Sequence, residues 1–357
     1  MPAARIPRAT FPHAVVIERG HRPRWWIPGL LAAVILLTGC SPGTHPIASA
    51  ASTAAAEPSV IDHPVRTTGC GHTTAGHTIT RTLQVNGLPR QYLAHLPAHT
   101  RADTPMPVVL YLHGGGRAPA DWLHIIDARS GFSALADRHH FIALYLLGST
   151  RPADGRVGWN TATAPLATYD PRADDVLFVG RILDDLQATL CVDNTRIYAT
   201  GFSSGASMTD VLACRLAGRI AAFAPVEGAY FPLPGGCHPA KPVSMISFAG
   251  TGDDKVPYDT ATTSGYGAGM EPVTRWLSDR AAIDGCAPTP TTFFAHDDVI
   301  GQRWTGCQAG ADLVHYRIAN GQHAWPGGTT WLGAPAGTAT IDATALILAF
   351  FTTHPPT

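Results

Sequence analysis

Two hydrophobic patterns alternate along this chain. Continuous apolar runs, which are typical of strands buried on both faces, occupy residues 108–112 and 141–147. Residues 174–190 predict a helix instead, because apolar side chains recur there at three- and four-residue steps. We also predict a hairpin at 81–96, strands at 195–200, 220–226, 243–248 and 313–318, and helices at 120–140, 207–216, 271–283 and 341–351. Strand and helix in alternation predict an α/β fold, with a mostly parallel central sheet and helices on both faces.

Composition narrows the class of protein mainly by exclusion. Of the 357 residues, 45% are hydrophobic and only 14% are charged, which indicates a globular chain. The formal net charge of −1 and the lack of a basic patch with interleaved aromatics argue against nucleic-acid binding. The sequence has 17 histidines but neither HExxH nor CxxC, so the usual zinc-ligand spacing is missing. We therefore expect no metal and no nucleic-acid partner.

The first forty residues have the pattern of an export signal. Arginines precede an apolar stretch at 25–37, which is interrupted by Pro28 and is shorter than the ~20 residues of a membrane-spanning helix. The stretch ends in LTGC, which resembles a bacterial lipobox, in which cleavage leaves a lipid-bearing cysteine, here Cys40, as the first residue. An ordinary signal peptide with an incidental cysteine is the alternative. We predict a lipoprotein signal at 1–40, and hence a chain anchored to the outer face of the bacterial cell membrane, or secreted if the lipobox is not used.

The segment after this signal has the composition of a linker. Residues 41–64 are rich in Ala, Ser, Thr and Pro and show no periodicity, which indicates a disordered tether. We expect the folded domain to occupy residues 65–355.

Six cysteines remain after Cys40, and an even number in an exported chain indicates three disulfides. Cys286 and Cys307 are close in sequence and flank two strand-like segments, so they are the first expected pair. Six cysteines allow 15 connectivities, so the other pairings stay open. One choice for them is Cys70 with Cys191 and Cys214 with Cys237.

A G-x-S-x-G sequence at 201–205 follows a predicted strand and precedes a predicted helix. A sharp turn of this kind lifts a nucleophilic serine, here Ser203, clear of the sheet and requires small residues on either side of it. The backbone amide of the next residue, Ser204, would hold a developing oxyanion. The pentapeptide alone is a weak signal, because chance matches are expected in a chain with 36 glycines.

A nucleophilic serine needs a base and a carboxylate, which follow it in this type of fold in the order acid, then histidine. His323 is the favoured base because it lies in a flexible loop after the strand 313–318, whereas His315 lies inside that strand. Asp253 and Asp254 both follow the strand 243–248, and their positions leave both open as the acid.

An HGGG sequence at 113–116 directly follows the predicted strand 108–112. Glycines at this place supply backbone amides to an oxyanion, so Gly114 and Gly115 are predicted to complete the oxyanion hole with Ser204. The alternative is a bare glycine turn.

Together these segments resemble the polyhydroxybutyrate depolymerase/feruloyl esterase family of α/β-hydrolases, which includes bacterial esterase lipoproteins. The segments that carry the resemblance are LHGGG at 112–116, DDV at 174–176, IYATGFSSG at 197–205, GTGDDKVPY at 250–258 and HAWPG at 323–327. The resemblance implies an α/β-hydrolase catalytic domain in which Ser203 is the nucleophile, Asp253 the acid and His323 the base, with no cofactor. The chain departs from the family at Ser204, where Asn is frequent, and ahead of the acid loop.

The function that follows is an exported serine carboxylic ester hydrolase that forms an acyl-enzyme. Its expected substrates are feruloyl or acetyl esters of polysaccharides, or hydroxyalkanoate esters of the polyhydroxybutyrate type. The alternative is a catalytically silent surface lipoprotein that uses the fold for binding. Trp159, Tyr258 and Trp325 lie in predicted loops near the site and are candidate substrate contacts, although loop packing explains each of them equally well.

Overall fold

The computed structural model describes residues 60–72, 76–98, 100–117, 120–161, 169–260, 269–327 and 337–354. The predicted signal with Cys40, and most of the predicted tether, lie outside the described residues. Across the described ranges, no helix is both long enough and apolar enough to cross a membrane.

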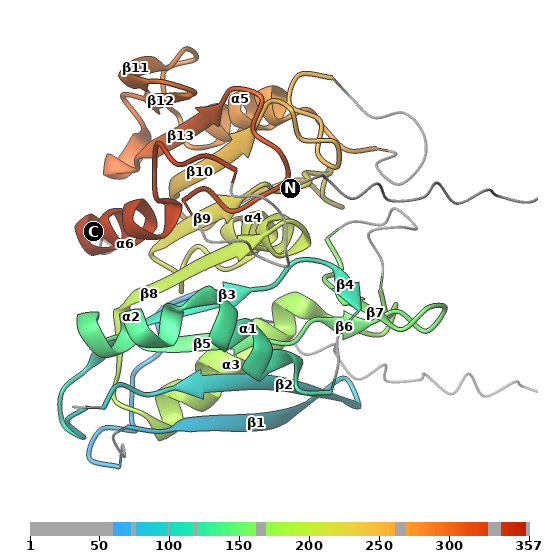
Figure 1. Cartoon of the computed structure of the whole chain (residues 1–357). Helices are drawn as coiled ribbons and strands as arrows, with labels where there is room; N and C mark the ends of the chain where they lie inside the picture. Colours follow the sequence, from blue (N-terminus) through green and yellow to red (C-terminus); the bar gives the residue numbers. More distant parts are fainter. Residues whose placement is uncertain are drawn as a thin grey trace, which may run out of the picture. The chain divides into compact units, whose positions relative to one another are not determined.

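A ten-stranded sheet forms the centre of the fold, in the order β1-β2-β5-β3-β8-β9-β10-β13-β12-β11 (Figure 1). Its middle strands run parallel; they are β5 (Ile142–Leu146), β3 (Met106–Leu112), β8 (Val192–Phe202), β9 (Ala222–Val226), β10 (Ser244–Gly250) and β13 (Leu313–Ile318). Antiparallel strands flank them on both sides; they are β1 (Thr78–Val85), β2 (Leu88–His95), β12 (Val299–Trp304) and β11 (Thr291–His296). A small second sheet contains β4 (Gly116–Arg117), β7 (Arg156–Gly158) and β6 (Ser149–Thr150). The predicted mostly parallel sheet is confirmed.

Helices cover both faces of the large sheet. The helices α3 (Asp175–Thr189), α4 (Ser204–Arg215) and α5 (Val273–Ile283) contribute to one apolar core. The helices α1 (Trp122–Ser130), α2 (Phe132–His139) and α6 (Ala343–Thr353) contribute to a second core. Strand β3 separates the two: Val108 and Leu110 belong to the first core, and Val109 and Tyr111 to the second. This division follows from the alternation of side chains along a strand.

The prediction of one helix over residues 120–140 is wrong. Gly131 adopts φ 69°, and its N–H bonds the carbonyl of Asp127, so α1 ends there and α2 starts separately. Glycine adopts this left-handed conformation at little steric cost, which explains the break. The helix predicted at 174–190 is confirmed, and Asp174 caps it by accepting the N–H of Leu177 at 2.8 Å.

Three disulfides tie the domain together, in the pairings considered above. Cys70–Cys191 joins the segment before β1 to the start of β8, across a sequence separation of 121. Cys214–Cys237 joins α4 to the chain after β9, and Cys286–Cys307 encloses the β11–β12 hairpin. Such cross-links stabilise a fold mainly by restricting the unfolded chain, each by about 2–4 kcal/mol.

The carboxyl ends of the parallel strands share one edge of the sheet, which is where ligands bind in open α/β folds. The residues that follow β3, β8 and β9 at this edge are His113, Ser203 and Glu227. The loops after β10 and β13 bring Asp253 and His323 to the same edge. The topology therefore gathers groups from five separate strands.

Candidate active site

The turn from β8 into α4 holds Ser203 in a strained conformation, with φ 55° and ψ −121°. The turn is so tight that a Cβ atom added at Gly205 would lie 2.1 Å from the carbonyl oxygen of Leu112. A Cβ atom at Gly201 would lie 2.4 Å from the carbonyl oxygen of Gly205. The N–H of Ser203 donates to the carbonyl of Val226 at 3.0 Å, which fixes the turn against β9. Both glycines of the motif are thus required because the turn leaves no room for a side chain at either position.

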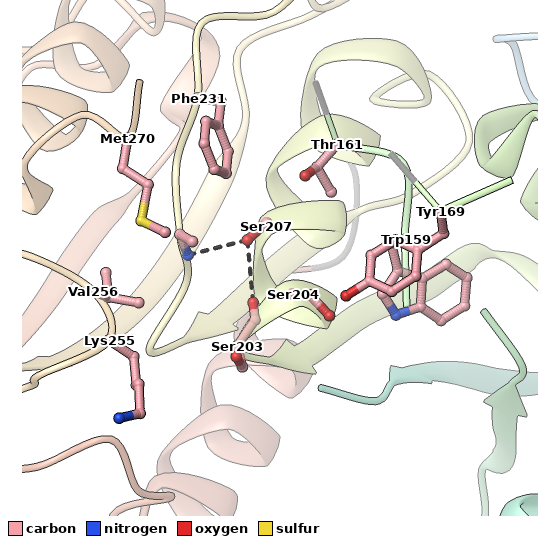
Figure 2. Close-up of a pocket in the computed structure, with 11 residues that line it drawn as sticks. Trp159, Thr161, Tyr169, Ser203, Ser204, Ser207, Phe231, Lys255, Val256 and Met270 are labelled. Carbon is pink, nitrogen blue, oxygen red and sulfur yellow. Dashed lines mark hydrogen bonds between the residues drawn. The ribbon is translucent and has the colours of Figure 1, made fainter. Parts of the chain in front are cut away.

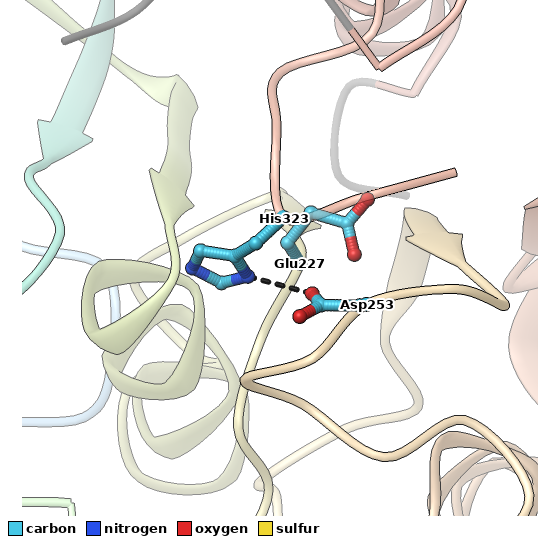
Figure 3. Close-up of side chains that lie close together, drawn as sticks. All are labelled: Glu227, Asp253 and His323. Carbon is cyan, nitrogen blue, oxygen red and sulfur yellow. Dashed lines mark hydrogen bonds and ion pairs between the residues drawn. The ribbon is translucent and has the colours of Figure 1, made fainter. Parts of the chain in front are cut away.

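His323 and Asp253 form a direct hydrogen-bonded pair beside this turn. The Nδ1 atom of His323 lies 2.6 Å from Oδ2 of Asp253, although the residues are 70 positions apart in sequence (Figure 3). Oδ1 of Asp253 accepts the backbone N–H groups of Lys255 and Val256, at 2.7 and 3.0 Å, so the carboxylate is held from both ends. Its side chain is fully buried, whereas that of Asp254 is 66% exposed and pairs with Lys255. The geometry therefore separates the two candidate acids.

The ring of His323 packs against Phe202, with 4.9 Å between the ring centroids, and this places it next to the serine turn. In the described part of the chain, no hydrogen bond joins His323 to the Ser203 hydroxyl. Catalytic hydrogen bonds of this kind often tighten only when substrate is bound.

His113 is a structural support for the loop after β3. Its Nδ1 bonds the carbonyl of Gly114 at 2.7 Å, and its Nε2 accepts the N–H of Gly148 at 3.0 Å. Burial lowers the pKa of His113 to about 4, so the ring is neutral at neutral pH, as these two bonds require. The indole N–H of Trp159 donates to the His113 carbonyl at 2.8 Å. The loop is therefore held from two sides.

The glycines of this loop lie against the serine turn. A Cβ atom on Gly114 would lie 3.3 Å from Cβ of Ser203, and one on Gly115 would lie 3.3 Å from Oγ of Ser204. A Cβ atom on Gly115 would also come within 2.7 Å of the Tyr169 hydroxyl. The structure thus brings together the three residues predicted to supply oxyanion amides.

A pocket opens beside Ser203, and Ser204 and Ser207 at the start of α4 contribute to its lining (Figure 2). Phe231 and Met270 stand on one side of it, and Trp159 and Tyr169 on the other. Its lining is mostly aromatic, aliphatic or uncharged, and consists of Trp159, Thr161, Tyr169, Ser203, Ser204, Ser207, Ala229, Phe231, Lys255, Val256 and Met270. Such a lining suits an apolar group better than a charged one.

Of the three aromatic residues expected to contact substrate, only Trp159 lines this pocket. Tyr258 is buried, and its hydroxyl lies 2.9 Å from Nε2 of the buried His315 in β13. Trp325 is also buried and donates its indole N–H to Thr344 of α6 at 2.9 Å. Both rings therefore turn inward to polar partners in the core, away from this pocket. Tyr169 was missed, since nothing in its local sequence marks its direction.

Glu227 is a further site residue that the sequence reasoning missed. It directly follows β9 and is 1% exposed. One of its carboxyl oxygens lies within 4.8 Å of a carboxyl oxygen of Asp253 and of a ring nitrogen of His323. The three residues have donor types that bind metals, but the 2.6 Å contact between Asp253 and His323 is too short to hold an ion between those atoms. Metal–ligand bonds of about 2.0–2.2 Å each require a wider gap. We therefore treat this cluster as a hydrogen-bonded one. A charged residue at the end of an otherwise apolar strand was its only sequence signal.

No protein-family model matches the chain. It is 26% identical to the putative esterase NocK of Nocardia uniformis subsp. tsuyamanensis, over 84% of this chain and 90% of that protein. It is 27% identical to feruloyl esterase B of Piromyces equi, over 66% of this chain and 42% of the relative. It is also 27% identical to poly(3-hydroxyalkanoate) depolymerase C of Paucimonas lemoignei, over 39% of this chain and 31% of the relative.

Among solved structures, the acetyl xylan esterase from Aspergillus awamori is similar at 14% identity and a TM-score of 0.49, over 69% of this chain and 94% of that one. Two of these sequence relatives are named esterases and one is named a depolymerase, which agrees with the activities that the family resemblance implied. The chain is thus similar in sequence to esterases and to a poly(3-hydroxyalkanoate) depolymerase, and it is a carboxylic ester hydrolase.

Proposed function

We propose that the protein cleaves carboxylic esters through an acyl-enzyme on Ser203, with His323 as the base and Asp253 as the acid that orients it. The observation that supports this most is the 2.6 Å contact between His323 and the buried Asp253, made beside the strained serine turn. A carboxylate at Nδ1 fixes the ring tautomer, so that Nε2 is the free acceptor for the serine proton. A binding protein has no need of this arrangement, which argues against the silent alternative.

In the proposed reaction, Oγ of Ser203 attacks the ester carbonyl carbon while Nε2 of His323 takes the hydroxyl proton. The carbonyl oxygen becomes an oxyanion that accepts hydrogen bonds from the amides of Ser204 and of the Gly114–Gly115 loop. Collapse of this intermediate breaks the ester C–O bond, and His323 returns the proton to the departing alkoxide. A water molecule then attacks the acyl carbon while Nε2 of His323 takes its proton. Collapse of this second intermediate breaks the bond between the acyl carbon and Oγ of Ser203, and His323 returns the proton to Oγ as the acid departs.

The substrates we propose are feruloyl or acetyl esters of polysaccharides and hydroxyalkanoate esters. The pocket supports an uncharged acyl group, since Trp159, Tyr169 and Phe231 offer aromatic surface next to Ser203. The names of the relatives support the same ester classes.

We predict that Ser203→Ala lowers kcat/KM by about 10⁴-fold or more on every ester that the protein hydrolyses, because no other group replaces the nucleophile. The esters to be tested are p-nitrophenyl acetate, methyl ferulate, acetylated xylan and hydroxybutyrate oligomers. The rate of product release is measured for each of them. The exposed Ser278→Ala serves as the matched control and should retain full activity. Equal activity of Ser203→Ala and the control would refute the nucleophile assignment.

We predict that Gly115→Ala lowers kcat/KM by about tenfold or more, because the new methyl group must displace Tyr169 or the oxyanion loop. Gly116→Ala is the matched control, since a Cβ atom at Gly116 meets no atom within 4 Å. Steady-state kinetics on p-nitrophenyl acetate and thermal melting of both variants provide the comparison. Similar kinetics for the two variants would contradict the crowding argument.

We also propose that the chain is exported and anchored through Cys40, which the lipobox-like LTGC sequence and the disulfides support. Mass spectrometry of the mature protein from a bacterial host should show an N-terminal Cys40 that carries a diacylglyceryl group. Cys40→Ser should release the protein from the membrane fraction. A mature N-terminus elsewhere, without lipid, would show that the lipobox is not used.

A further inference from the structure

Glu227 is a buried acid for which the proposed mechanism has no role. Its side chain is 1% exposed, and its backbone adopts φ 52°, which is uncommon for a residue other than glycine. A buried carboxylate without a cation beside it is costly, and so is this backbone conformation. Both features occur next to the proposed catalytic pair, where such costs are usually functional.

The main chain holds Glu227 between the serine turn and the acid loop. Its own N–H donates to the carbonyl of Phe248 in β10 at 2.9 Å. The preceding carbonyl, that of Val226, accepts the N–H of Ser203. The N–H of Gly250, where β10 ends, donates to both carboxyl oxygens of Glu227 at 3.0 and 3.1 Å. The carboxyl group is therefore fixed in position relative to both loops.

The hydrogen bonds of Asp253 leave one acceptor position for Glu227. A carboxylate has about four lone-pair positions, two on each oxygen. Backbone N–H groups occupy two of them on Oδ1, and His323 occupies one on Oδ2. The carboxyl group of Glu227 lies next to Asp253 in the same cluster (Figure 3).

Two buried carboxyl groups this close cannot both be ionised without a large repulsion, so a proton between them removes the conflict. Burial first, and the charge of Asp253 second, raise the pKa of Glu227 well above its ordinary range. The other titratable groups that face Glu227 are His323 and the hydroxyls of Tyr230 and Tyr258. None of the groups in this set is a fixed cation that would stabilise a second negative charge.

We propose that Glu227 is a positioning residue of the esterase site: its neutral carboxyl group donates a hydrogen bond to Asp253 and holds that carboxylate in line with His323. Glu227 acts only through Asp253 and does not touch the ester. This inference rests on the proposed function, because the alignment of Asp253 matters only if His323 is the catalytic base.

The protonation state of Glu227 is measured directly by infrared difference spectroscopy. The spectrum of the wild-type protein minus that of Glu227→Gln at pH 7 should contain the carbonyl stretch of one protonated carboxylic acid. Glutamine has nearly the same shape, accepts from Gly250 and donates to Asp253, so the rest of the site stays in place. A carboxylate signal from Glu227 at this pH would overturn the proposal.

Kinetics of two variants show whether the donated hydrogen bond matters. Glu227→Gln keeps a donor and should retain kcat within about threefold, whereas Glu227→Ala should lose on the order of tenfold or more in kcat with little change in KM. Glu271→Ala, the matched control outside the site, should behave as wild type, and thermal melting reports whether each variant is folded.

The outcomes of this experiment are distinct from those for the proposed function. Wild-type activity in Glu227→Ala, or a loss in folded Glu227→Gln as large as that in Glu227→Ala, would overturn the role of Glu227. Neither result bears on the nucleophile, which the Ser203→Ala comparison in the same assay tests separately.

Discussion

The turn from β8 into α4 sets a steric constraint that the rest of the site depends on. A side chain at Gly201 or Gly205 would overlap backbone atoms, and a Cβ at Gly205 would meet the end of β3 itself. Because the turn packs so closely, Ser203 is forced to the edge of the sheet, and α4 starts directly behind it. The close approach also sets the distance between the serine and the glycine loop that follows β3. One local restriction on side-chain volume thus positions both sides of the candidate oxyanion site.

The parallel sheet supplies the second requirement, which is that distant segments end at the same edge. Loops after β10 and β13 meet only because their strands are neighbours, and this brings Asp253 and His323 within hydrogen-bonding distance. Two buried neutral histidines support this edge of the sheet. His113 holds the glycine loop. Burial lowers the pKa of His315 to about 3, so this ring is neutral when it bonds Ser247 and Tyr258. Hydrogen bonds therefore fix the loops at this edge, and the pocket beside them is lined mostly by uncharged side chains.

The sequence predicts those parts of the fold and site that are determined locally. Apolar runs identify the strands of the parallel sheet, and G-x-S-x-G after a strand identifies the tight turn. The orientation of a side chain that is set by residues distant in sequence is not visible in a local pattern. The inward orientation of Tyr258 and Trp325 was therefore missed. The break at Gly131 was missed because a single glycine within a helical stretch does not by itself mark a helix end. Glu227 was missed because a single acidic residue after a strand carries no local signal. Its importance depends on its proximity to Asp253, which only the three-dimensional structure shows.

The proposed reaction depends on one serine, activated by one histidine, that forms a covalent acyl-enzyme. The most direct measurement is labelling of the active protein with a phosphonylating ester analogue, followed by mass spectrometry of the digested protein. We expect one adduct per chain, on the peptide that contains Ser203, and its loss in His323→Ala. An adduct on a different residue, or full ester hydrolysis by a protein that forms no adduct, would contradict an acyl-enzyme on Ser203.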